Sequence, residues 1–459
     1  MKLGVQKLFS AVTSLLAVAG AVALPAGAQA QPITGVYRGE IYNAPNLINA
    51  YSAWLGHEVT MGQGHQPKDS WANIENPSWQ LNAWGAWVRA KAGRRLNYSV
   101  AMFPSGQGSL AQCATGAYDF RFRNLANNMA NAGLQRSIIR LGWEFSGSWM
   151  PWYSGNGQQA NFAECFRRIV TAMRTAQPNA GFEFDWNPNY DISASDLAAT
   201  YPGNAYVDYI GFDLYDQGWN GRYPIPSGCT GACRLARWQE NWNVQFAPAL
   251  TRFRNFAQAR GKRLSVPEWG VNDAATTGGG DNTYFVQQML SFIFDPANNV
   301  GYHSYFDYQA PDGHHQLSNV DSNGGHTFQT EFPNAAALFK SFYANLPSPG
   351  GTLSTSRATV SPSTVTRGQS FQVTGSVTSP TAQTLVVKYE IRSAASPYTL
   401  IDEQFYSQAF TAGQTRAFTS TLVIPTSRPA GTYRVDTLVY TSNWSQTLLY
   451  RNDTTFTAN

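Results

Sequence analysis

The sequence has few charged residues and no cluster of one sign. Asp, Glu, Lys and Arg make up only 13% of its 459 residues, against a usual value of ~25%. The formal net charge is +4, and Lys2 and Lys7 supply two of these charges, so residues 31–459 carry +2. Because no Lys/Arg cluster provides a basic surface, we expect no nucleic-acid partner.

Long apolar runs are absent after the first 30 residues. Two lysines precede an apolar stretch from about Leu8 to Leu24, and Ala28-Gln29-Ala30 has the small-x-small pattern of a cleavage site. We expect residues 1–30 to be a secretory signal peptide, with a retained membrane anchor as the alternative. No other stretch approaches the ~20 apolar residues of a transmembrane helix. The sequence therefore predicts a secreted, extracellular or periplasmic protein with no membrane partner after signal removal.

Cysteine is scarce, with four residues in the chain. An even number in an exported chain permits disulfides. Cys229 and Cys233 enclose a three-residue loop and are favoured as a pair, which leaves Cys113 and Cys165 for each other. A zinc site is the alternative, but a single C-x3-C pattern lacks a second ligand pair nearby. We expect no metal and no other cofactor.

Aromatic residues, by contrast, are abundant. They make up 14% of the chain, including 14 Trp and 23 Tyr. Aromatic rings stack on the apolar faces of sugars, although they also fill large cores. Together with the low charge, this composition favours a neutral, polar ligand such as a carbohydrate.

Short apolar runs alternate with longer helical patterns from residue 33 to about 346. The eight predicted strands are Ile33–Arg38, Glu58–Gly62, Tyr98–Phe103, Ser137–Glu144, Phe182–Trp186, Val207–Tyr215, Leu264–Glu268 and Tyr302–Tyr308. The predicted helices include Tyr118–Ala132, Gln159–Arg174, Leu235–Gly261, Asn282–Phe294 and Ala335–Ala344. Eight such repeats predict an α/β fold in which residues 31–346 form a closed (β/α)8 TIM barrel. An open doubly wound sheet is the alternative, but Gly39-Glu40-Ile41-Tyr42 is not the glycine-rich phosphate-binding turn that it would need.

The pattern changes after a segment rich in Pro and Gly, so we predict a linker at residues 347–356. Five runs with period-two alternation follow: Phe371–Thr378, Leu385–Arg392, Phe418–Ile424, Thr432–Tyr440 and Thr447–Phe456. They predict that residues 357–459 form a small all-β sandwich, immunoglobulin-like or jelly-roll. We expect this domain to be a spacer. The alternative is that it binds glycan through Tyr440, Trp444 and Tyr450.

Two glutamates are placed for catalysis. Glu144 ends the fourth predicted strand and Glu268 the seventh, and barrel active sites form at the carboxyl ends of the strands. Two carboxyl groups that meet across a barrel mouth can cleave a glycosidic bond, with retention when they are ~5–5.5 Å apart and inversion at ~6.5–9.5 Å. Flanking aromatics, such as Trp143 beside Glu144 and Trp269 beside Glu268, raise a carboxyl pKa. The alternative is structural pairing with arginine, Arg140 being the candidate for Glu144.

Three motifs carry a family resemblance. Arg140–Trp152, with the sequence Arg-Leu-Gly-Trp-Glu-Phe-Ser-Gly-Ser-Trp-Met-Pro-Trp, resembles the Arg-x-x-x-Glu-x-Asn-Gly-x-Trp block of glycoside hydrolase family 26. Val207–Tyr215 and Pro267–Gly270 are similar to the sixth and seventh strands of its clan. The resemblance implies that Glu144 is the acid/base and Glu268 the nucleophile. It also implies that Tyr215 orients Glu268 by a hydrogen bond.

Two positions depart from the family pattern. Mannanases of the family place a His directly before the acid/base, where this chain has Trp143, and the Asn of the block is Ser146. An indole in place of imidazole changes the subsite next to the scissile bond. Mannan is therefore one of several candidate substrates, together with xylan, mixed β-glucan and bacterial exopolysaccharide.

Further residues at strand ends and in adjacent loops are candidates for binding the sugar. They are His65, Arg140, Trp143, Trp149, Trp152, Trp186, Asn187, Asp213, Trp269, Tyr305 and Tyr308. A structural role in the core or in a hydrogen-bond network is the alternative for each. His314 and His315 lack a third ligand at metal spacing, so we expect an exposed loop there.

Residues and resemblance together imply a secreted, monomeric, endo-acting glycoside hydrolase similar to β-mannanases. It would cleave the β-glycosidic bonds of a polysaccharide by double displacement. The alternatives from other classes are a non-catalytic carbohydrate-binding protein on a hydrolase-like barrel and a cell-surface scaffold.

Overall fold

The computed structural model describes residues 31–39, 44–219, 221–344, 346, 353–380, 383–411, 414–444 and 447–459. The predicted signal peptide lies outside the described residues, as does the predicted linker from residue 347 to 352. The described end of that linker includes a short strand, β11 (Ser354–Thr355), which pairs with β14 (Ser370–Thr378). Within the described residues, no helix has the length and apolar character needed to cross a membrane.

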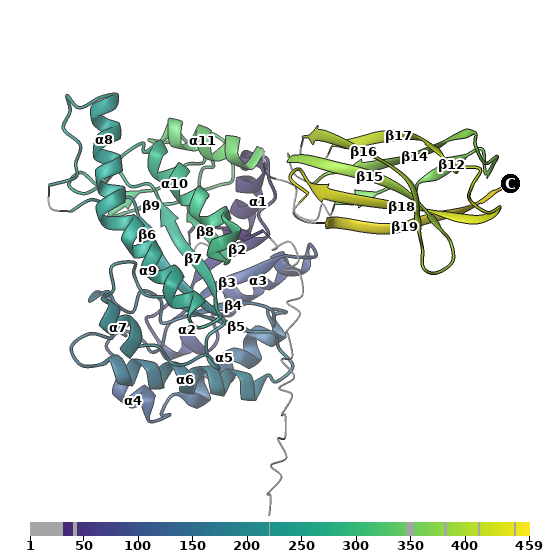
Figure 1. Ribbon diagram of the computed structural model, residues 1–459. Coiled ribbons are helices and arrows are strands. Elements are labelled where there is room, and N and C mark those ends of the chain that lie inside the picture. The colour runs from purple at the N-terminus through teal and green to yellow at the C-terminus, as the bar shows by residue number, and fades with distance from the viewer. Residues whose placement is uncertain are drawn as a thin grey trace, which may run out of the picture. The chain divides into compact units, whose positions relative to one another are not determined.

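Eight parallel strands form a closed barrel in which each strand lies beside the next in the sequence (Figure 1). The strands are β1 (Ile33–Tyr37), β2 (Met61–His65), β3 (Arg95–Val100), β4 (Ile138–Leu141), β5 (Glu183–Trp186), β6 (Tyr209–Tyr215), β7 (Arg263–Gly270) and β8 (Val300–Phe306). β8 pairs with β1 along five residues and closes the sheet. The predicted (β/α)8 barrel is confirmed.

The second and third strands differ most from their predicted bounds. β3 covers Arg95–Val100, three residues earlier than the predicted Tyr98–Phe103. β2 covers Met61–His65, three residues later than predicted, and contains two glycines that give it a low strand propensity. The indole of Trp84, on a helix outside the barrel, packs on Gly62 and Gly64, where an added Cβ would collide with the ring. Packing against Trp84 therefore holds this segment in the sheet, which local propensity does not reveal.

Helices lie outside the ring of strands (Figure 1). They are α1 (Ala44–Leu55), α2 (Trp71–Glu75), α3 (Ser78–Arg89), α4 (Leu110–Ala114), α5 (Asp119–Asn131), α6 (Gln159–Ala176), α7 (Ala194–Ala199), α8 (Ala232–Asn241), α9 (Ala247–Gln258), α10 (Thr283–Phe294) and α11 (Pro333–Ala344). α6 shows why they pack there, because Phe162, Phe166, Ile169 and Met173 form one buried stripe at helical spacing.

The helix predicted over Leu235–Gly261 is divided into three parts. α8 is followed by a π-helical turn, η1 (Trp242–Phe246), and then by α9. Pro248 lies in the first turn of α9. Because proline lacks an N–H, it cannot continue the hydrogen-bond ladder of the preceding helix. A short 3-10 helix, η2 (Pro296–Asn298), precedes β8.

Two disulfides are present, and both have the predicted partners. Cys113 of α4 is bonded to Cys165 of α6. Cys229, which lies just before α8, is bonded to Cys233, which lies in its first turn. The first one joins two helices that are 52 residues apart in the sequence, and the second one closes a short loop.

The region after residue 353 is all-β, as predicted. One sheet contains β11, β12 (Thr359–Ser361), β14 and β17 (Thr415–Val423). The other has the order β13 (Thr364–Val365), β19 (Thr447–Ala458), β18 (Gly431–Thr441), β15 (Gln383–Ser393) and β16 (Leu400–Phe410). Apolar side chains of both sheets, such as Val373 and Val387, form one core. β16 was not predicted, because Asp402 and Gln404 interrupt its apolar alternation on the side that bonds β17.

Candidate active site

Glu144 lies three residues beyond the end of β4 and not at the strand end that was predicted. The strand stops at Leu141, and Gly142 follows with a φ of +58°. Glu144 itself has a φ of +51°, a conformation that costs a residue with a side chain about 1–3 kcal/mol. Its N–H donates to the carbonyl of Asn187 at 2.8 Å. This bond ties the loop after β4 to the end of β5.

Glu268 lies within β7, next to a β-bulge. Gly211 of β6 is opposite Ser265, whereas Asp213 is opposite Glu268, so β7 has one extra residue in this stretch. Pro267 is part of the extra stretch and has no N–H to donate to a neighbouring strand. Bulges re-aim the side chains that follow them, and here the side chain that follows is that of Glu268.

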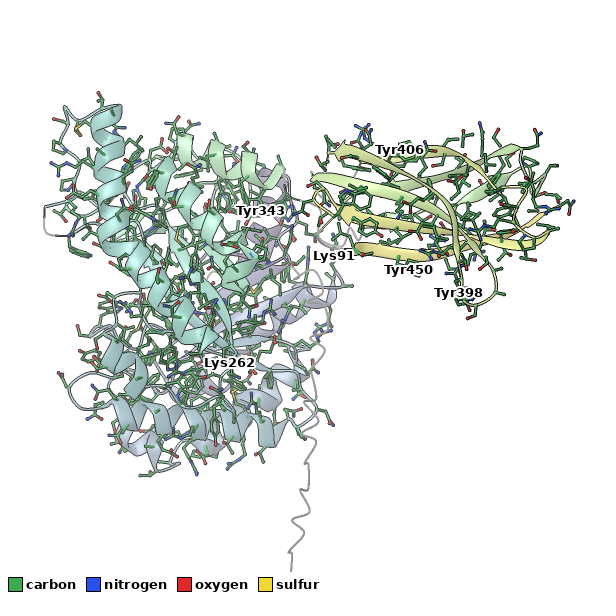
Figure 2. The ribbon with its side chains drawn as sticks, viewed as in Figure 1. Lys91, Lys262, Tyr343, Tyr398, Tyr406 and Tyr450 are labelled. Carbon is green, nitrogen blue, oxygen red and sulfur yellow. A yellow bond between two sulfur atoms is a disulfide. The ribbon has the colours of Figure 1, made fainter. Side chains whose placement is uncertain are left out.

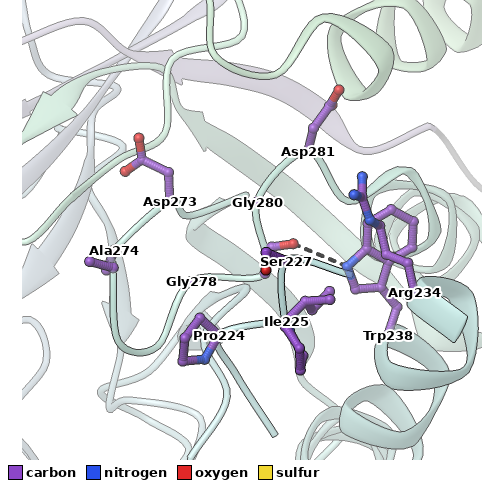
Figure 3. A pocket seen from close by; sticks show the side chains of 13 residues that line it. Pro224, Ile225, Ser227, Arg234, Trp238, Asp273, Ala274, Gly278, Gly280 and Asp281 are labelled. Carbon is purple, nitrogen blue, oxygen red and sulfur yellow. Dashed lines mark hydrogen bonds between the residues drawn. The ribbon is translucent and has the colours of Figure 1, made fainter. Parts of the chain in front are cut away.

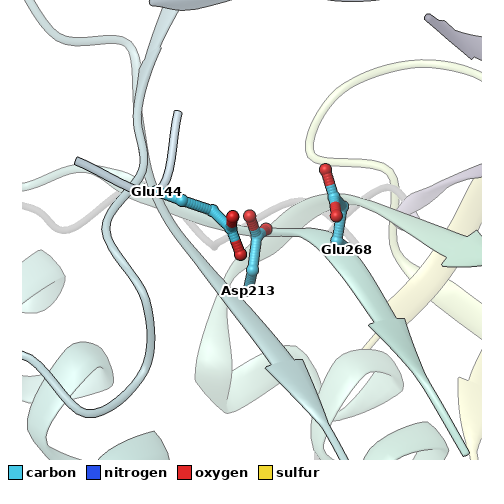
Figure 4. A group of neighbouring side chains, drawn as sticks. All are labelled: Glu144, Asp213 and Glu268. Carbon is cyan, nitrogen blue, oxygen red and sulfur yellow. The ribbon is translucent and has the colours of Figure 1, made fainter. Parts of the chain in front are cut away.

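The two glutamates meet at the barrel mouth together with Asp213 (Figure 4). One carboxylate oxygen from each of Glu144, Asp213 and Glu268 lies within 4.8 Å of the other two. This spacing agrees with the ~5–5.5 Å between the carboxyl groups of retaining glycosidases. It leaves less room than the ~6.5–9.5 Å of inverting enzymes, in which a water molecule stands between the two groups.

Four side chains surround the Glu268 carboxylate. Arg140 Nη1 donates to Oε1 at 2.6 Å, and Tyr215 Oη donates to Oε2 at 2.6 Å. His65 Nε2 lies 2.8 Å from Oε1, and Gln63 Nε2 donates to the same oxygen at 3.3 Å. Burial alone would raise the pKa of Glu268, but Arg140, His65 and Tyr215 outweigh it and hold the pKa below its usual value. Glu268 therefore remains an anion.

Arg140 is the centre of this network and is fully buried. Its Nη2 donates to Asp213 Oδ2 at 2.7 Å and to Asn187 Oδ1 at 2.5 Å, and its Nη1 donates to Ser99 Oγ at 2.8 Å. The alternative that Arg140 pairs with Glu144 is wrong, because its carboxylate partners are Asp213 and Glu268. The guanidinium also supplies the positive charge that these two carboxylates require.

Glu144 has much weaker support. Trp149 Nε1 donates to Oε2 at 3.1 Å, and no ion pair to Glu144 occurs among the described residues. Burial and, to a smaller extent, the negative charge of Glu268 raise the pKa of Glu144 to about 7. A carboxyl group with this pKa keeps its proton up to neutral pH, which a general acid requires.

Two of the predicted sugar-binding aromatics are exposed at the barrel mouth. The side chain of Trp149 is 66% exposed, and that of Tyr308 is 37% exposed. Trp143 is 6% exposed and packs on His65 and Trp152, with ring centroids 5.3 and 4.6 Å apart. Trp149 therefore offers the largest ring surface next to Glu144.

Four other predicted binding residues are wrong as sugar contacts, because their side chains have no exposed surface. Their polar atoms already have partners inside the protein. Trp152 donates to the Trp143 carbonyl at 2.7 Å, Trp186 to the Thr200 carbonyl at 3.2 Å, Trp269 to His303 Nδ1 at 3.1 Å and Tyr305 to the His315 carbonyl at 2.9 Å. These rings are part of the hydrophobic core of the barrel.

His65, Asn187, Asp213 and Arg140 lie around Glu268, and the last three are at most 2% exposed. Asn187, Asp213 and Arg140 are therefore wrong as sugar contacts, and Asn187 and Asp213 hold the guanidinium that bonds Glu268. The side chain of His65 is 16% exposed beside Glu268, so its contact with the sugar stays a prediction. The expected exposed loop at His314 and His315 is wrong for His315, which is 2% exposed and bonds the Val271 carbonyl through Nδ1 at 2.6 Å.

Two residues of the network were missed in the sequence. Gln63 of β2 bonds Glu268, and Ser99 of β3 bonds Arg140. Both are fully buried. The available signal was a polar side chain in the middle of a short strand, because such a residue needs a buried partner.

A separate pocket of about 290 Å³ lies between the loops that follow β6 and β7 (Figure 3). One side of the pocket is lined by Pro224, Ile225, Arg234 and Trp238. The other side is lined by residues 273–275 and 278–281. Trp238 Nε1 donates to the Gly279 carbonyl at 3.0 Å and joins the two sides. None of the predicted site residues lines this pocket.

Comparison with known proteins finds similarity to one family of glycoside hydrolases over part of the chain. Residues 71–227 match the model of glycosyl hydrolase family 26. A mannan endo-1,4-beta-mannosidase of Bifidobacterium adolescentis is 31% identical over 81 residues, which are 17% of this chain and only 8% of that relative. An endo-beta-1,4-mannanase double mutant of Cellulomonas fimi has 15% identity and a TM-score of 0.46 over 94% of each chain. GH26C from Muricauda sp. has 17% identity and a TM-score of 0.49 over 69% of this chain and 86% of its own. Residues 71–227 of the chain are therefore similar to glycosyl hydrolase family 26.

Proposed function

We propose that this protein is an exported, retaining glycoside hydrolase that cleaves a β-linked polysaccharide of the mannan type. The observation that carries the proposal is the pair Glu144 and Glu268, whose carboxylate oxygens lie within 4.8 Å of each other in opposite electrostatic surroundings. One of the two carboxyl groups is suited to hold a proton at neutral pH and the other to remain charged.

The first step uses both carboxyl groups. A Glu268 carboxylate oxygen attacks the anomeric carbon while the bond from that carbon to the leaving oxygen breaks. Glu144 donates its proton to the leaving oxygen. Arg140 and Tyr215 hold opposite oxygens of Glu268 at 2.6 Å, so the nucleophile is oriented before the substrate arrives.

The second step releases the sugar. Glu144, now ionised, removes a proton from water, and the water oxygen attacks the anomeric carbon as the bond to Glu268 breaks. The charge of Glu268 contributes to the high pKa of Glu144. Because Glu268 carries no charge in the glycosyl-enzyme, this contribution disappears and Glu144 becomes a carboxylate at the stage where a base is needed.

Mannan as the substrate class rests on the family match over residues 71–227 and on the curated relative, which is named a mannan endo-1,4-beta-mannosidase. The exposed indole of Trp149 beside Glu144 offers a stacking surface for a sugar next to the cleavage point. Export is supported by the apolar N-terminal stretch in the sequence and by the two disulfides.

The test is hydrolysis of a polysaccharide panel by the purified chain, with the anomeric configuration of the first product followed by NMR. We expect a β product from mannan. Glu144→Gln is expected to lower kcat by about 10²–10⁴-fold, and Glu268→Ala by at least as much. Glu240→Gln, a matched change on the exposed side of α8, is expected to have no effect. Near-normal hydrolysis by Glu268→Ala, or an α product, would contradict the proposal.

A further inference from the structure

The outer face of the five-stranded sheet carries a row of four side chains, three of which are apolar or aromatic. Leu385, Val387, Tyr389 and Ile391 of β15 face the core, so the side chains between them face outward. The strand register places Phe405 of β16 and Leu438 of β18 opposite Lys388 on either side, and Tyr450 of β19 opposite Leu438. The row therefore crosses four strands from Phe405 to Tyr450.

Aromatic rings at the two ends of this row, and one in the turn after β18, are exposed. Phe405 and Tyr450 are each 55% exposed, and Trp444, in the turn after β18, is 43% exposed. The Trp444 ring contacts Phe405 and Tyr440, with centroids 5.1 and 5.0 Å apart. Tyr450 is labelled in Figure 2, as is Tyr406, which instead extends toward β17 and donates to the Thr419 carbonyl. Clustered exposed apolar surface marks binding sites in soluble proteins.

Trp444 is an unusual residue for its turn. Its φ is +61°, a region that glycine and asparagine enter at much lower cost. Its N–H donates to the Thr441 carbonyl at 2.9 Å, so the turn needs only the backbone at this position. The turn itself does not account for a large exposed indole, whereas a binding surface formed with Phe405 and Tyr440 does.

Charged side chains beside the row neutralise one another. Lys388 pairs with Glu390 at 2.8 Å and with Glu403 at 2.5 Å, and Arg392 pairs with Glu390 at 2.6 Å. Arg434 pairs with Asp436 at 2.9 Å, and Asp436 also accepts a bond from Tyr450 Oη at 3.0 Å. Three basic and three acidic side chains leave this face without net charge.

We propose that this face, defined by Phe405, Tyr440, Trp444 and Tyr450, binds a chain of a neutral polysaccharide. Rings offer stacking surfaces to the apolar faces of sugars. Arg392 and Glu403, whose side chains are partly exposed, offer a donor and an acceptor to hydroxyl groups. Three strand spacings separate Phe405 from Tyr450, which is about 14 Å, enough for an extended oligosaccharide. A polyanion needs a net positive surface, which this face lacks.

The test measures binding without hydrolysis. The full-length Glu268→Ala chain is incubated with insoluble mannan, cellulose and xylan, and the bound fraction is determined by sedimentation. We expect binding to at least one of these polymers, and an at least tenfold lower affinity when Phe405→Ala and Tyr450→Ala are added. The matched control is Trp79→Ala with Phe120→Ala, two exposed rings on α3 and α5, for which no change is expected.

Several outcomes would overturn the inference. One is no binding of the Glu268→Ala chain to any of the three polymers. Another is equal binding with and without the two outer-face changes, with binding lost instead on Trp149→Ala, which would assign it to the barrel mouth. A shift from dimer to monomer in size-exclusion chromatography would assign the face to a second copy of the chain. If the double variant does not fold, the single variant Trp444→Asn is used in its place, because asparagine is compatible with the backbone of this turn.

Failure of the native chain to hydrolyse mannan would leave the binding result unaffected.

Discussion

The end of β7 and the loop after β4 place the same functional group, a glutamate carboxyl, in opposite surroundings. Glu268 lies inside β7, directly after its bulge, with Arg140, Tyr215, His65 and Gln63 around its two oxygens. Glu144 lies in a loop with a left-handed backbone, and the indole N–H of an exposed tryptophan is its side-chain donor. The pKa of the first is lowered, and that of the second is raised to about 7.

The difference shows that surroundings, and not residue type, divide the two roles. Buried donors around Glu268 stabilise its charged form, whereas burial without a cationic partner favours the neutral form of Glu144. Changing the donors one at a time should therefore make the two sites more alike, and the size of each effect should follow the strength of the donor removed.

The largest effect is expected for Arg140→Met. The change leaves Asp213 and Glu268 buried without their shared cation, which costs about 3–5 kcal/mol of unfolding free energy. It also raises the pKa of Glu268, so we expect kcat to fall at least a thousandfold. Denaturant unfolding and steady-state kinetics measure the two effects.

Arg167→Met is the matched control for this change. Arg167 pairs with Glu164 on the surface of α6 at 2.7 Å, and such pairs contribute ~0–1 kcal/mol. If Arg140→Met were as stable and active as Arg167→Met, the view that Arg140 distinguishes the two glutamates would be wrong.

A smaller effect is expected for Tyr215→Phe, which removes the hydroxyl that donates to Glu268 Oε2 at 2.6 Å. A hydrogen bond to a charged group contributes about 1.5–3 kcal/mol, so kcat should fall about 10- to 100-fold. Because Tyr215 lowers the pKa of Glu268, its loss raises that pKa and moves the acid limb of the kcat/KM profile to higher pH. Tyr209→Phe, on the same strand, should leave the acid limb unchanged.

The smallest effect is expected for Trp149→Phe, which keeps an aromatic ring and removes the N–H bonded to Glu144 at 3.1 Å. This bond lowers the pKa of Glu144. Its loss should raise the pKa above about 7 and move the basic limb of the kcat/KM profile to higher pH. Trp219→Phe, at another exposed indole, is the control. A basic limb that moves to lower pH would contradict the assignment of Glu144 as the acid.

The sequence predicted the barrel because eight apolar runs alternate with helical patterns, but it did not predict the bulge in β7. In the bulge, Val266 and Pro267 of β7 together lie opposite one residue of β6. This pairing depends on a strand that is more than 50 residues away in the sequence. The bounds of β2 depend likewise on Trp84, which packs on its glycines. Local patterns contain neither contact.

The positions of Glu144 and Glu268 near strand ends were predictable, whereas the partner of Arg140 was not. Arg140 and Glu144 are four residues apart in the sequence, yet the turn after β4 separates them and the guanidinium reaches across the barrel to Glu268. Trp186 and Trp269 are adjacent to site residues in the sequence, and Trp152 is three residues from Trp149, but all three are fully buried in the core. Which way a ring points depends on the packing of the whole barrel.

The backbone of Glu144 has a consequence for heat resistance. Its φ of +51° is unfavourable for a residue with a side chain. A carboxyl whose pKa is about 7 when folded and 4.5 when unfolded makes the fold less stable as pH rises from about 4.5, with the full loss above pH 7. Asparagine or glycine at position 144 would relieve both penalties. Directed evolution that selects only for thermal stability is therefore expected to replace Glu144, and the variants it selects would lose the proposed acid/base.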